Sequence, residues 1–187
     1  MGVSSGGMAA LNVVLPMLSA DFGLPVIIVQ HQHPHADDFL VRYLNGKCRI
    51  PVKHAEEKES IEANTLYLAP PNYHLLIEQD RTFSLSISAR VNYARPSIDV
   101  LFETAADAFG AHTIGIILTG ANNDGSRGLK RIHDRGGLTI VQNPATAEAV
   151  EMPRAAIAAT QIDHILPLEG IGLLLNTIQH HEGTYTV

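Results

Sequence analysis

Two short apolar segments, PVIIVQ at 25–30 and TIGIIL at 113–118, constrain the fold more than any other feature of the chain. Both are rich in β-branched residues, and neither alternates between apolar and polar positions. This pattern is typical of strands that are buried on both faces of a parallel sheet. Parallel strands are joined by crossovers that usually contain a helix, so helices are expected between the strands of this chain.

The rest of the chain shows this alternation. Helices are predicted at 8–20, 37–44, 98–109, 126–134, 145–159 and 168–180, and further strands at 138–142 and 164–166. Three short strand-like segments, at 65–69, 75–78 and 82–88, are separated by turn sequences and are expected to form hairpins. The sequence therefore predicts an α/β fold with a doubly wound, mostly parallel sheet, helices on both faces and an antiparallel hairpin extension. Because it contains no repeat or linker, residues 1–187 are expected to form a single domain.

Charge and composition exclude several classes of function. The net charge of −6 argues against nucleic acid as a partner, because phosphate binding requires clustered Lys and Arg. The single cysteine, Cys48, cannot form an internal disulfide, and no signal-peptide pattern is present, which indicates a cytoplasmic protein. Membrane insertion is not expected, because no apolar run approaches the roughly 20 residues that a spanning helix needs.

A turn rich in Gly and Ser, GVSSGG at 2–7, lies directly before the helix predicted at 8–20. Its first five residues fit the G-x-S-x-G pattern, in which small residues allow a sharp bend that presents the serine at the mouth of a pocket. The N-terminus of the helix offers unpaired N–H groups to a developing oxyanion. The same pattern also fits a phosphate-binding loop or an ordinary turn, so it does not by itself identify a nucleophile.

Ser4, His31 and Asp124 occupy the same kind of position, because each follows a predicted strand or opens a helix. Such positions meet at one edge of a parallel sheet. A hydrolytic triad needs a nucleophile, a base and a carboxylate that orients the base, and these residues supply all three. Each also has a structural interpretation, as a helix cap for Ser4 and Asp124 and as a hydrogen-bonded strand-end histidine for His31.

Longer stretches extend this interpretation over nearly the whole chain: IVQH at 28–31, LYLAPPNYHL at 66–75, RPSIDVLF at 95–102, GIILTGANNDGSRGL at 115–129, GGLTIVQNPATAEAVEMPRAAI at 136–157 and the closing LPLEGI. With GVSSGG, they resemble the catalytic domain of the chemotaxis receptor methylesterases, the CheB-type protein-glutamate methylesterases. The resemblance implies a serine hydrolase that cleaves glutamyl γ-methyl esters on the cytoplasmic helical region of methyl-accepting chemotaxis receptors. It also implies deamidation of glutamines at the same sites, no cofactor, and a triad of Ser4, His31 and Asp124.

Three further residues are expected at the mouth of the site. The backbone N–H groups of Ser5 and Ala121 are the expected oxyanion donors, because their side chains offer no suitable donors. Arg95, at the start of RPSIDVLF, is expected to bind a carboxylate on a glutamate-rich substrate helix. The alternative for Arg95 is a structural role in a salt bridge or a stacked contact.

The chain departs from the family's pattern in four places. Only Met1 precedes Gly2, where the family has an apolar strand, so either this chain starts late or Ser4 lacks its usual support. Ala121 replaces a methionine, Glu151 replaces a glycine, and the histidine-rich HQHPH at 31–35 replaces the usual residues after the histidine.

Two alternative functions remain, a metal site and a catalytically inactive docking member of the fold. His31, His33 and His35, with Asp37 nearby, could bind a metal in a metallohydrolase or a metal-binding module. An α/β-hydrolase esterase is disfavoured, because its triad follows the order Ser, Asp, His.

Regulation gives a further expectation. Members of the family commonly carry an N-terminal receiver domain, which needs on the order of 120 residues. Since three residues precede Ser4, no receiver domain is expected, and activity should not require a phosphodonor. Two expectations follow: a stand-alone esterase that is controlled by a trans-acting partner or by its expression, or a chain that is a fragment of a longer protein.

Overall fold

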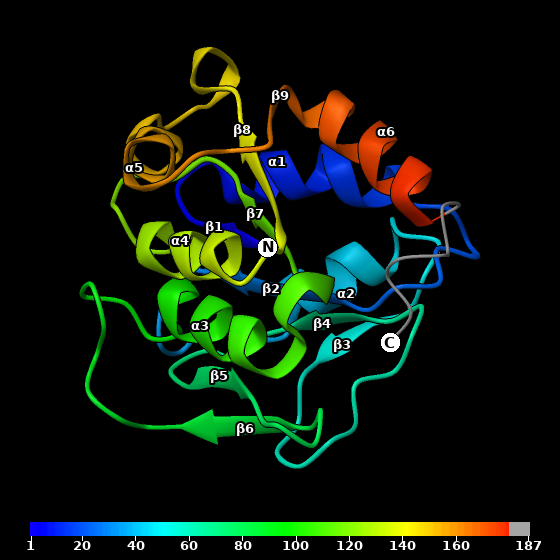
Figure 1. The fold of residues 1–187 in the computed structure, drawn as a ribbon. Helices are drawn as coiled ribbons and strands as arrows, with labels where there is room; N and C mark the ends of the chain where they lie inside the picture. Colours follow the sequence, from blue (N-terminus) through cyan, green and yellow to red (C-terminus); the bar gives the residue numbers. More distant parts are fainter. Residues whose placement is uncertain (180–187) are drawn as a thin grey trace.

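A computed structural model describes residues 1–179, which form one seven-stranded sheet with a separate two-stranded hairpin beside it (Figure 1). The predicted end of the last helix, at 180, lies outside the described residues. The order in the large sheet is β3-β4-β2-β1-β7-β8-β9, and all of its strand pairs are parallel. Its strands are β1 (Gly2–Val3), β2 (Val26–Gln30), β3 (Val52–His54), β4 (Leu66–Leu68), β7 (Ile114–Ile117), β8 (Leu138–Gln142) and β9 (His164–Leu166).

Helices cover both faces of this sheet, which confirms the doubly wound architecture. One face packs against α1 (Gly7–Val14), α2 (Phe39–Asn45) and α6 (Leu168–Gln179). The other face packs against α3 (Ile98–Phe109), α4 (Ser126–Asp134) and α5 (Glu151–Ala159). Because successive strand residues point to opposite faces, Ile116 enters the first core and Ile117 the second.

Two helices are shorter than predicted. The helix expected at 8–20 corresponds to α1, which ends at Val14 and is followed by a 3-10 turn, Leu15–Met17. Pro16 in this turn lacks the N–H that an α-helix needs. In the segment expected to be helical at 145–159, α5 begins only at Glu151. The preceding Asn143 accepts a hydrogen bond from the N–H of Ala145, which stabilises a local turn in place of a helix.

The alternative in which Ser4 lacks its usual supporting strand is wrong. Gly2 and Val3 form the central strand β1, in which Gly2 lies opposite Val29 of β2 and Ile117 of β7. The ladder also includes Met1, whose amino group donates to Ile27 O at 2.7 Å and whose carbonyl accepts from Val29 N at 3.0 Å. Ser4 therefore follows directly from the middle strand of the sheet.

The segment from 50 to 88 also differs from the prediction. Only β5 (His74–Ile77) and β6 (Phe83–Ser86) pair as an antiparallel hairpin. The first of the three expected strands, β4, instead joins the large sheet and pairs in parallel with β2 and with the unpredicted β3. All three residues of β4 are buried, which is the pattern of a parallel strand rather than a hairpin strand with one solvated face.

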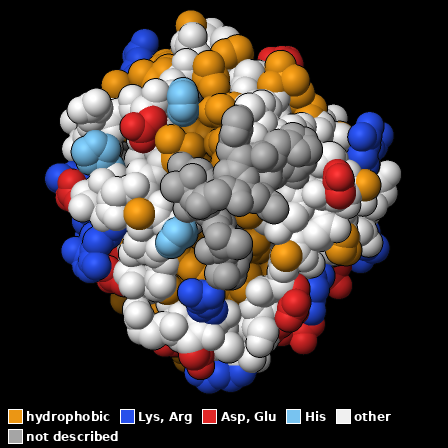
Figure 2. Space-filling model, turned by 45° about the vertical axis from the view of Figure 1, so that its right-hand side comes forward, with side chains coloured by type: hydrophobic (Ala, Val, Ile, Leu, Met, Phe, Trp, Pro, Cys, Tyr) orange, Lys and Arg blue, Asp and Glu red, His pale blue; other side chains and the backbone are white. Residues whose placement is uncertain are grey.

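The surface shows no single charged patch on the face drawn in Figure 2, where basic and acidic side chains lie interspersed around hydrophobic ones. None of the helices within residues 1–179 is both long and apolar enough to cross a membrane.

Candidate active site

The three predicted triad positions lie at the carboxyl ends of three adjacent strands. Ser4 follows β1, His31 follows β2, and Asp124 lies in the loop that leads from β7 to α4. The sheet ladder continues into the first two positions, since Ser4 N donates to Thr119 O at 3.0 Å and His31 N donates to Val3 O at 3.1 Å. The backbone at the site is thus fixed by the sheet itself.

The side chains of these residues form one continuous line of hydrogen bonds. His31 Nδ1 lies 3.2 Å from Ser4 Oγ, and His31 Nε2 lies 2.9 Å from Asp124 Oδ2. One neutral tautomer satisfies both contacts: Nε2–H donates to the carboxylate, and Nδ1 accepts from the serine hydroxyl. The imidazole is therefore oriented to take a proton from Ser4.

Asp124 is fully buried and receives hydrogen bonds from several donors. Oδ1 accepts from Ser97 Oγ at 2.7 Å, Asn92 Nδ2 at 3.0 Å and Asp99 N at 3.2 Å, and Oδ2 accepts from Ile98 N at 2.7 Å. Burial alone would raise the pKa of Asp124, but these hydrogen bonds and that from His31 outweigh it and lower the pKa below its ordinary value. The carboxylate stays ionised at neutral pH.

Asp124 also caps helix α3, because its oxygens accept from the first N–H groups of that helix, those of Ile98 and Asp99. Ser97 directly precedes α3, and a serine in that place commonly caps a helix, but it does not do so here. Ser97 makes no side-chain capping bond and instead donates its hydroxyl to Asp124.

A second buried carboxylate, Asp99, lies beside Asp124. Asn92 Nδ2 bridges the two, at 2.8 Å from Asp99 Oδ2 and 3.0 Å from Asp124 Oδ1, and Gly128 N donates to Asp99 Oδ1 at 2.7 Å. Burial raises the pKa of Asp99, and the neighbouring charge of Asp124 acts in the same direction. Asn92 and Asp99 were not anticipated from the sequence.

His74 supports the same network from the hairpin side. It is fully buried, accepts from Ser97 N at Nδ1 over 3.2 Å and donates from Nε2 to Ala89 O at 3.0 Å. These two contacts assign its proton to Nε2 and fix the backbone of Ser97, whose hydroxyl contacts Asp124.

Two backbone N–H groups near Ser4 lack protein acceptors. Within residues 1–179, neither Ser5 N nor Ala121 N donates a hydrogen bond to another residue. The loops that carry them are tied together through Thr119, whose hydroxyl donates to Ser5 O at 2.8 Å and accepts from Ala149 N at 2.9 Å. Both N–H groups are thus without an acceptor in the described part of the chain, and their role as oxyanion donors stays a prediction.

Arg95 lines a pocket of about 200 Å³ that includes His31. Its guanidinium donates to the carbonyls of Ile87 and Ser88, at 2.6 and 2.9 Å, and to Asn72 Oδ1, at 2.8 Å from Nη2. These contacts support the structural alternative, although the acceptors are neutral groups rather than a salt-bridge partner. The predicted contact of Arg95 with a substrate carboxylate stays a prediction.

The histidines after β2 do not form a compact cluster. His31 faces Ser4 and Asp124, while the rings of His33 and His35 lie 5.6 Å apart. Among residues 1–179, no group of three or more His, Cys, Asp or Glu side chains is arranged to hold a metal ion. The geometry thus offers no support for the metal alternative.

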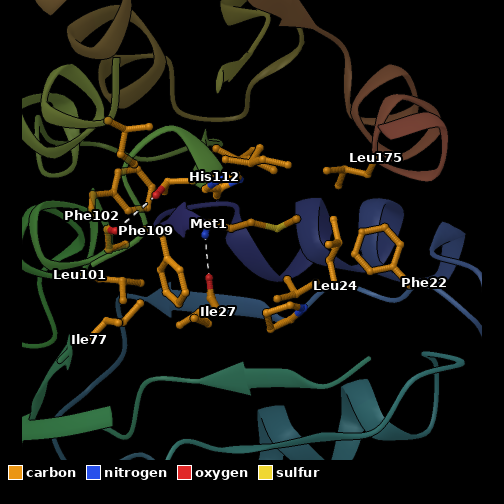
Figure 3. A pocket seen from close by; sticks show the side chains of 17 residues that line it. Met1, Phe22, Leu24, Ile27, Ile77, Leu101, Phe102, Phe109, His112 and Leu175 are labelled. Carbon is orange, nitrogen blue, oxygen red and sulfur yellow. Dashed lines mark hydrogen bonds between the residues drawn. The ribbon is translucent and has the colours of Figure 1, made fainter. Parts of the chain in front are cut away.

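A second cavity, of about 150 Å³, lies at the amino ends of the strands, away from the triad (Figure 3). Its lining is mostly apolar and includes Met1, Ile27, Leu101 and Phe102, with no triad residue. Burial lowers the pKa of the Met1 amino group to about 5, so the group is largely uncharged at neutral pH.

Comparison with known proteins assigns this arrangement to a family. Residues 1–175 match the family described as CheB methylesterase. The chain belongs to this family. A putative protein-glutamate methylesterase/protein-glutamine glutaminase of Leptospira interrogans is 55% identical over 174 residues, which cover 93% of this chain and 90% of the relative. A protein-glutamate methylesterase/protein-glutamine glutaminase of Mesorhizobium japonicum is 38% identical over 92% of this chain, which spans 51% of that longer protein.

A solved structure supports the same assignment. The crystal structure of the Thermotoga maritima CheB methylesterase catalytic domain superposes with a TM-score of 0.91 at 31% identity, and 95% of each chain is covered. The parallel sheet with helices on both faces is therefore the fold of a known methylesterase domain.

Proposed function

We propose that this chain is a serine hydrolase that cleaves γ-methyl esters of glutamyl side chains on methyl-accepting chemotaxis receptors and deamidates glutamines at the same sites. One observation carries the proposal: in a member of the CheB methylesterase family, Ser4, His31 and Asp124 are joined by hydrogen bonds of 3.2 and 2.9 Å. The names of the relatives, which combine methylesterase and glutaminase activity, support both reactions.

In the first half of the reaction, His31 Nδ1 takes the hydroxyl proton of Ser4 while Oγ attacks the ester carbonyl carbon. The N–H groups of Ser5 and Ala121 donate to the oxyanion of the tetrahedral intermediate. As the intermediate collapses, the bond to the methoxy oxygen breaks, and this oxygen takes the proton from His31 and leaves as methanol. The glutamyl group remains bound to Ser4 as an acyl-enzyme.

Water completes the reaction. His31 removes a proton from the water as it attacks the acyl carbon, then returns that proton to Ser4 Oγ when the glutamate carboxylate leaves. With a glutamine substrate, the first leaving group is ammonia. Asp124 stays ionised throughout, holds the His31 tautomer and stabilises the imidazolium that forms in each half.

The receptor region in question is its cytoplasmic helical part, so the reaction takes place in the cytoplasm. The free thiol of Cys48 fits a reducing compartment. The described residues act as one catalytic domain built on a single large sheet.

The test replaces the nucleophile and its neighbour separately. Ser4→Ala should abolish nearly all methanol release from a methylated receptor fragment, because Ser4 Oγ is the hydroxyl that His31 contacts. Ser5→Ala is the matched control: it removes an exposed hydroxyl but keeps the backbone N–H, so it should retain most of the activity.

Two results would contradict the proposal. If Ser4→Ala keeps most of its activity, the serine mechanism is wrong, and if the wild-type chain releases no methanol, it is a docking member without activity. Dialysis against a strong chelator should leave the rate unchanged. A loss of rate that zinc restores would instead favour the histidine-based metal site.

A further inference from the structure

A strained turn next to the triad carries a bulky side chain. Val91 and Ala94 exchange two backbone hydrogen bonds, of 3.1 and 2.9 Å, around Asn92 and Tyr93. Both central residues have left-handed backbones, with φ values of 49° and 63°. Asparagine tolerates this conformation, whereas a large aromatic residue is disfavoured there, and Gly or Asn is usual at both positions of such a turn. The turn thus keeps Tyr93 at a cost in conformational energy.

The position of this turn relative to the triad is fixed. Asn92 Nδ2 reaches inward to Asp124 and Asp99, at 3.0 and 2.8 Å. The chain before and after the turn is held by buried His74, which donates to Ala89 O, and by Arg95, which donates to the carbonyls of Ile87 and Ser88. The turn is therefore a rigid platform attached to the catalytic carboxylate.

Tyr93 contributes nothing to the fold that would offset this cost. Its side chain is 97% exposed, and within residues 1–179 it has no hydrogen bond or ring contact. It nevertheless lines the same 200 Å³ pocket as His31. Backbone strain without a gain in packing is typical of functional positions, and tyrosine is enriched at the centres of protein interfaces.

The charge of the pocket indicates what binds beside Tyr93. Its lining contains two arginines, Arg90 and Arg95, and no Asp or Glu, although the whole chain carries a net charge of −6. Arg95 is occupied by neutral acceptors. Arg90 is exposed and has no ion pair within the described part of the chain, so its guanidinium is available to an incoming carboxylate.

We propose that Tyr93 and Arg90 form the docking surface for the glutamate-bearing helix of the protein substrate. Tyr93 packs against the side chains that flank the esterified glutamate, and Arg90 pairs with an unmodified glutamate on the same helix. The reaction itself produces glutamate carboxylates, so a substrate with several sites presents such groups next to the remaining ester. This inference rests on the proposed function, because it assigns the protein substrate of that same site.

The experiment compares a receptor fragment with a small ester. In Tyr93→Asn, the strained position in the turn is occupied by a residue that tolerates a left-handed backbone, so the melting temperature should stay the same or rise. We expect kcat/KM for methanol release from a methylated receptor fragment to fall about tenfold, mainly through KM, as for loss of an interface anchor. Hydrolysis of p-nitrophenyl acetate, which has neither flanking side chains nor a neighbouring carboxylate for Tyr93 and Arg90 to bind, should be unchanged.

Two further variants complete the test. Arg90→Ala should raise KM for the receptor fragment and weaken its dependence on salt concentration. Leu173→Ala is the control: this residue of α6 is also exposed, at 62%, but does not line the pocket, so neither substrate should be affected.

The outcomes separate this inference from the proposed function. A wild-type chain that releases no methanol from the receptor fragment refutes both. An active wild type with an unchanged KM in Tyr93→Asn and Arg90→Ala refutes only the docking surface. A lowered melting temperature in Tyr93→Asn, or equal losses on both substrates, would show that Tyr93 has a structural role.

Discussion

The hydroxyl of Ser97 allows a direct test of how the catalytic carboxylate is held, because it can be removed with little change in side-chain volume. Ser97 Oγ donates to Asp124 Oδ1 at 2.7 Å, and both side chains are fully buried. A hydrogen bond to a buried charged acceptor contributes about 1.5–3 kcal/mol. Four other donors remain on Asp124, so the fold should survive, and Ser97→Ala should lower the free energy of unfolding at pH 7 by about 2 kcal/mol.

The loss should depend on pH with a defined sign. The pKa of Asp124 is lower in the folded chain than its ordinary value. At pH values above the ordinary pKa, the ionised carboxylate therefore stabilises the folded state, and this stabilisation is lost as the pH falls through the lower pKa of the folded chain. Removal of one donor moves the folded pKa of Asp124 upward. The difference between wild type and Ser97→Ala should be constant from neutral pH to about pH 5 and should shrink below it.

Urea unfolding across this pH range measures the effect, and Ser126→Ala provides the control. Ser126 Oγ also donates a 2.7 Å hydrogen bond, to Asn123 O, but that bond is exposed, so its loss should cost less than about 0.5 kcal/mol. Equal costs for the two variants, or a Ser97→Ala cost that persists unchanged at low pH, would refute this account of Asp124.

Two further variants test other contacts at the site. Arg95→Ala should reduce the rate equally on a receptor fragment and on a small ester if Arg95 only holds the loop at 87–88, whereas an increase in KM confined to the receptor fragment would show a substrate contact. Gly128→Ala should lower the free energy of unfolding by about 1–3 kcal/mol in urea titrations, since the alanine Cβ would lie 2.5 Å from Phe102 Cβ and 3.0 Å from Asp99 O. A cost below about 0.5 kcal/mol would show that α3 and α4 move apart freely to accept the methyl group.

The parts of this molecule that the sequence revealed depend on local patterns. The strands β2 and β7 are visible as apolar runs bounded by polar residues, and the polar residues that follow them fall at one edge of any parallel sheet. Ser4 was found through the small residues around it. The two-residue strand β1 was missed, because it is defined only by its pairing with β2 and β7.

The network around Asp124 could not be predicted, because it consists of contacts between distant segments. Asn92 lies 32 residues from Asp124 in the chain, and Ser97 lies 27 residues from it. Locally, Ser97 looks like a helix cap, since serine before a helix usually has that role. The cap is supplied instead by a carboxylate from another loop, and no local pattern distinguishes these two arrangements.

The same hydrogen bonds therefore serve the fold and the chemistry. Asp124, in the loop directly before α4, caps α3, and Asp99 of α3 accepts from Gly128 N in the first turn of α4, so the N-terminal ends of the two helices are joined through both carboxylates. A carboxylate that satisfies helix N–H groups cannot swing away without leaving those groups unpaired in a buried setting. The orientation of His31 is thus tied to how α3 and α4 pack.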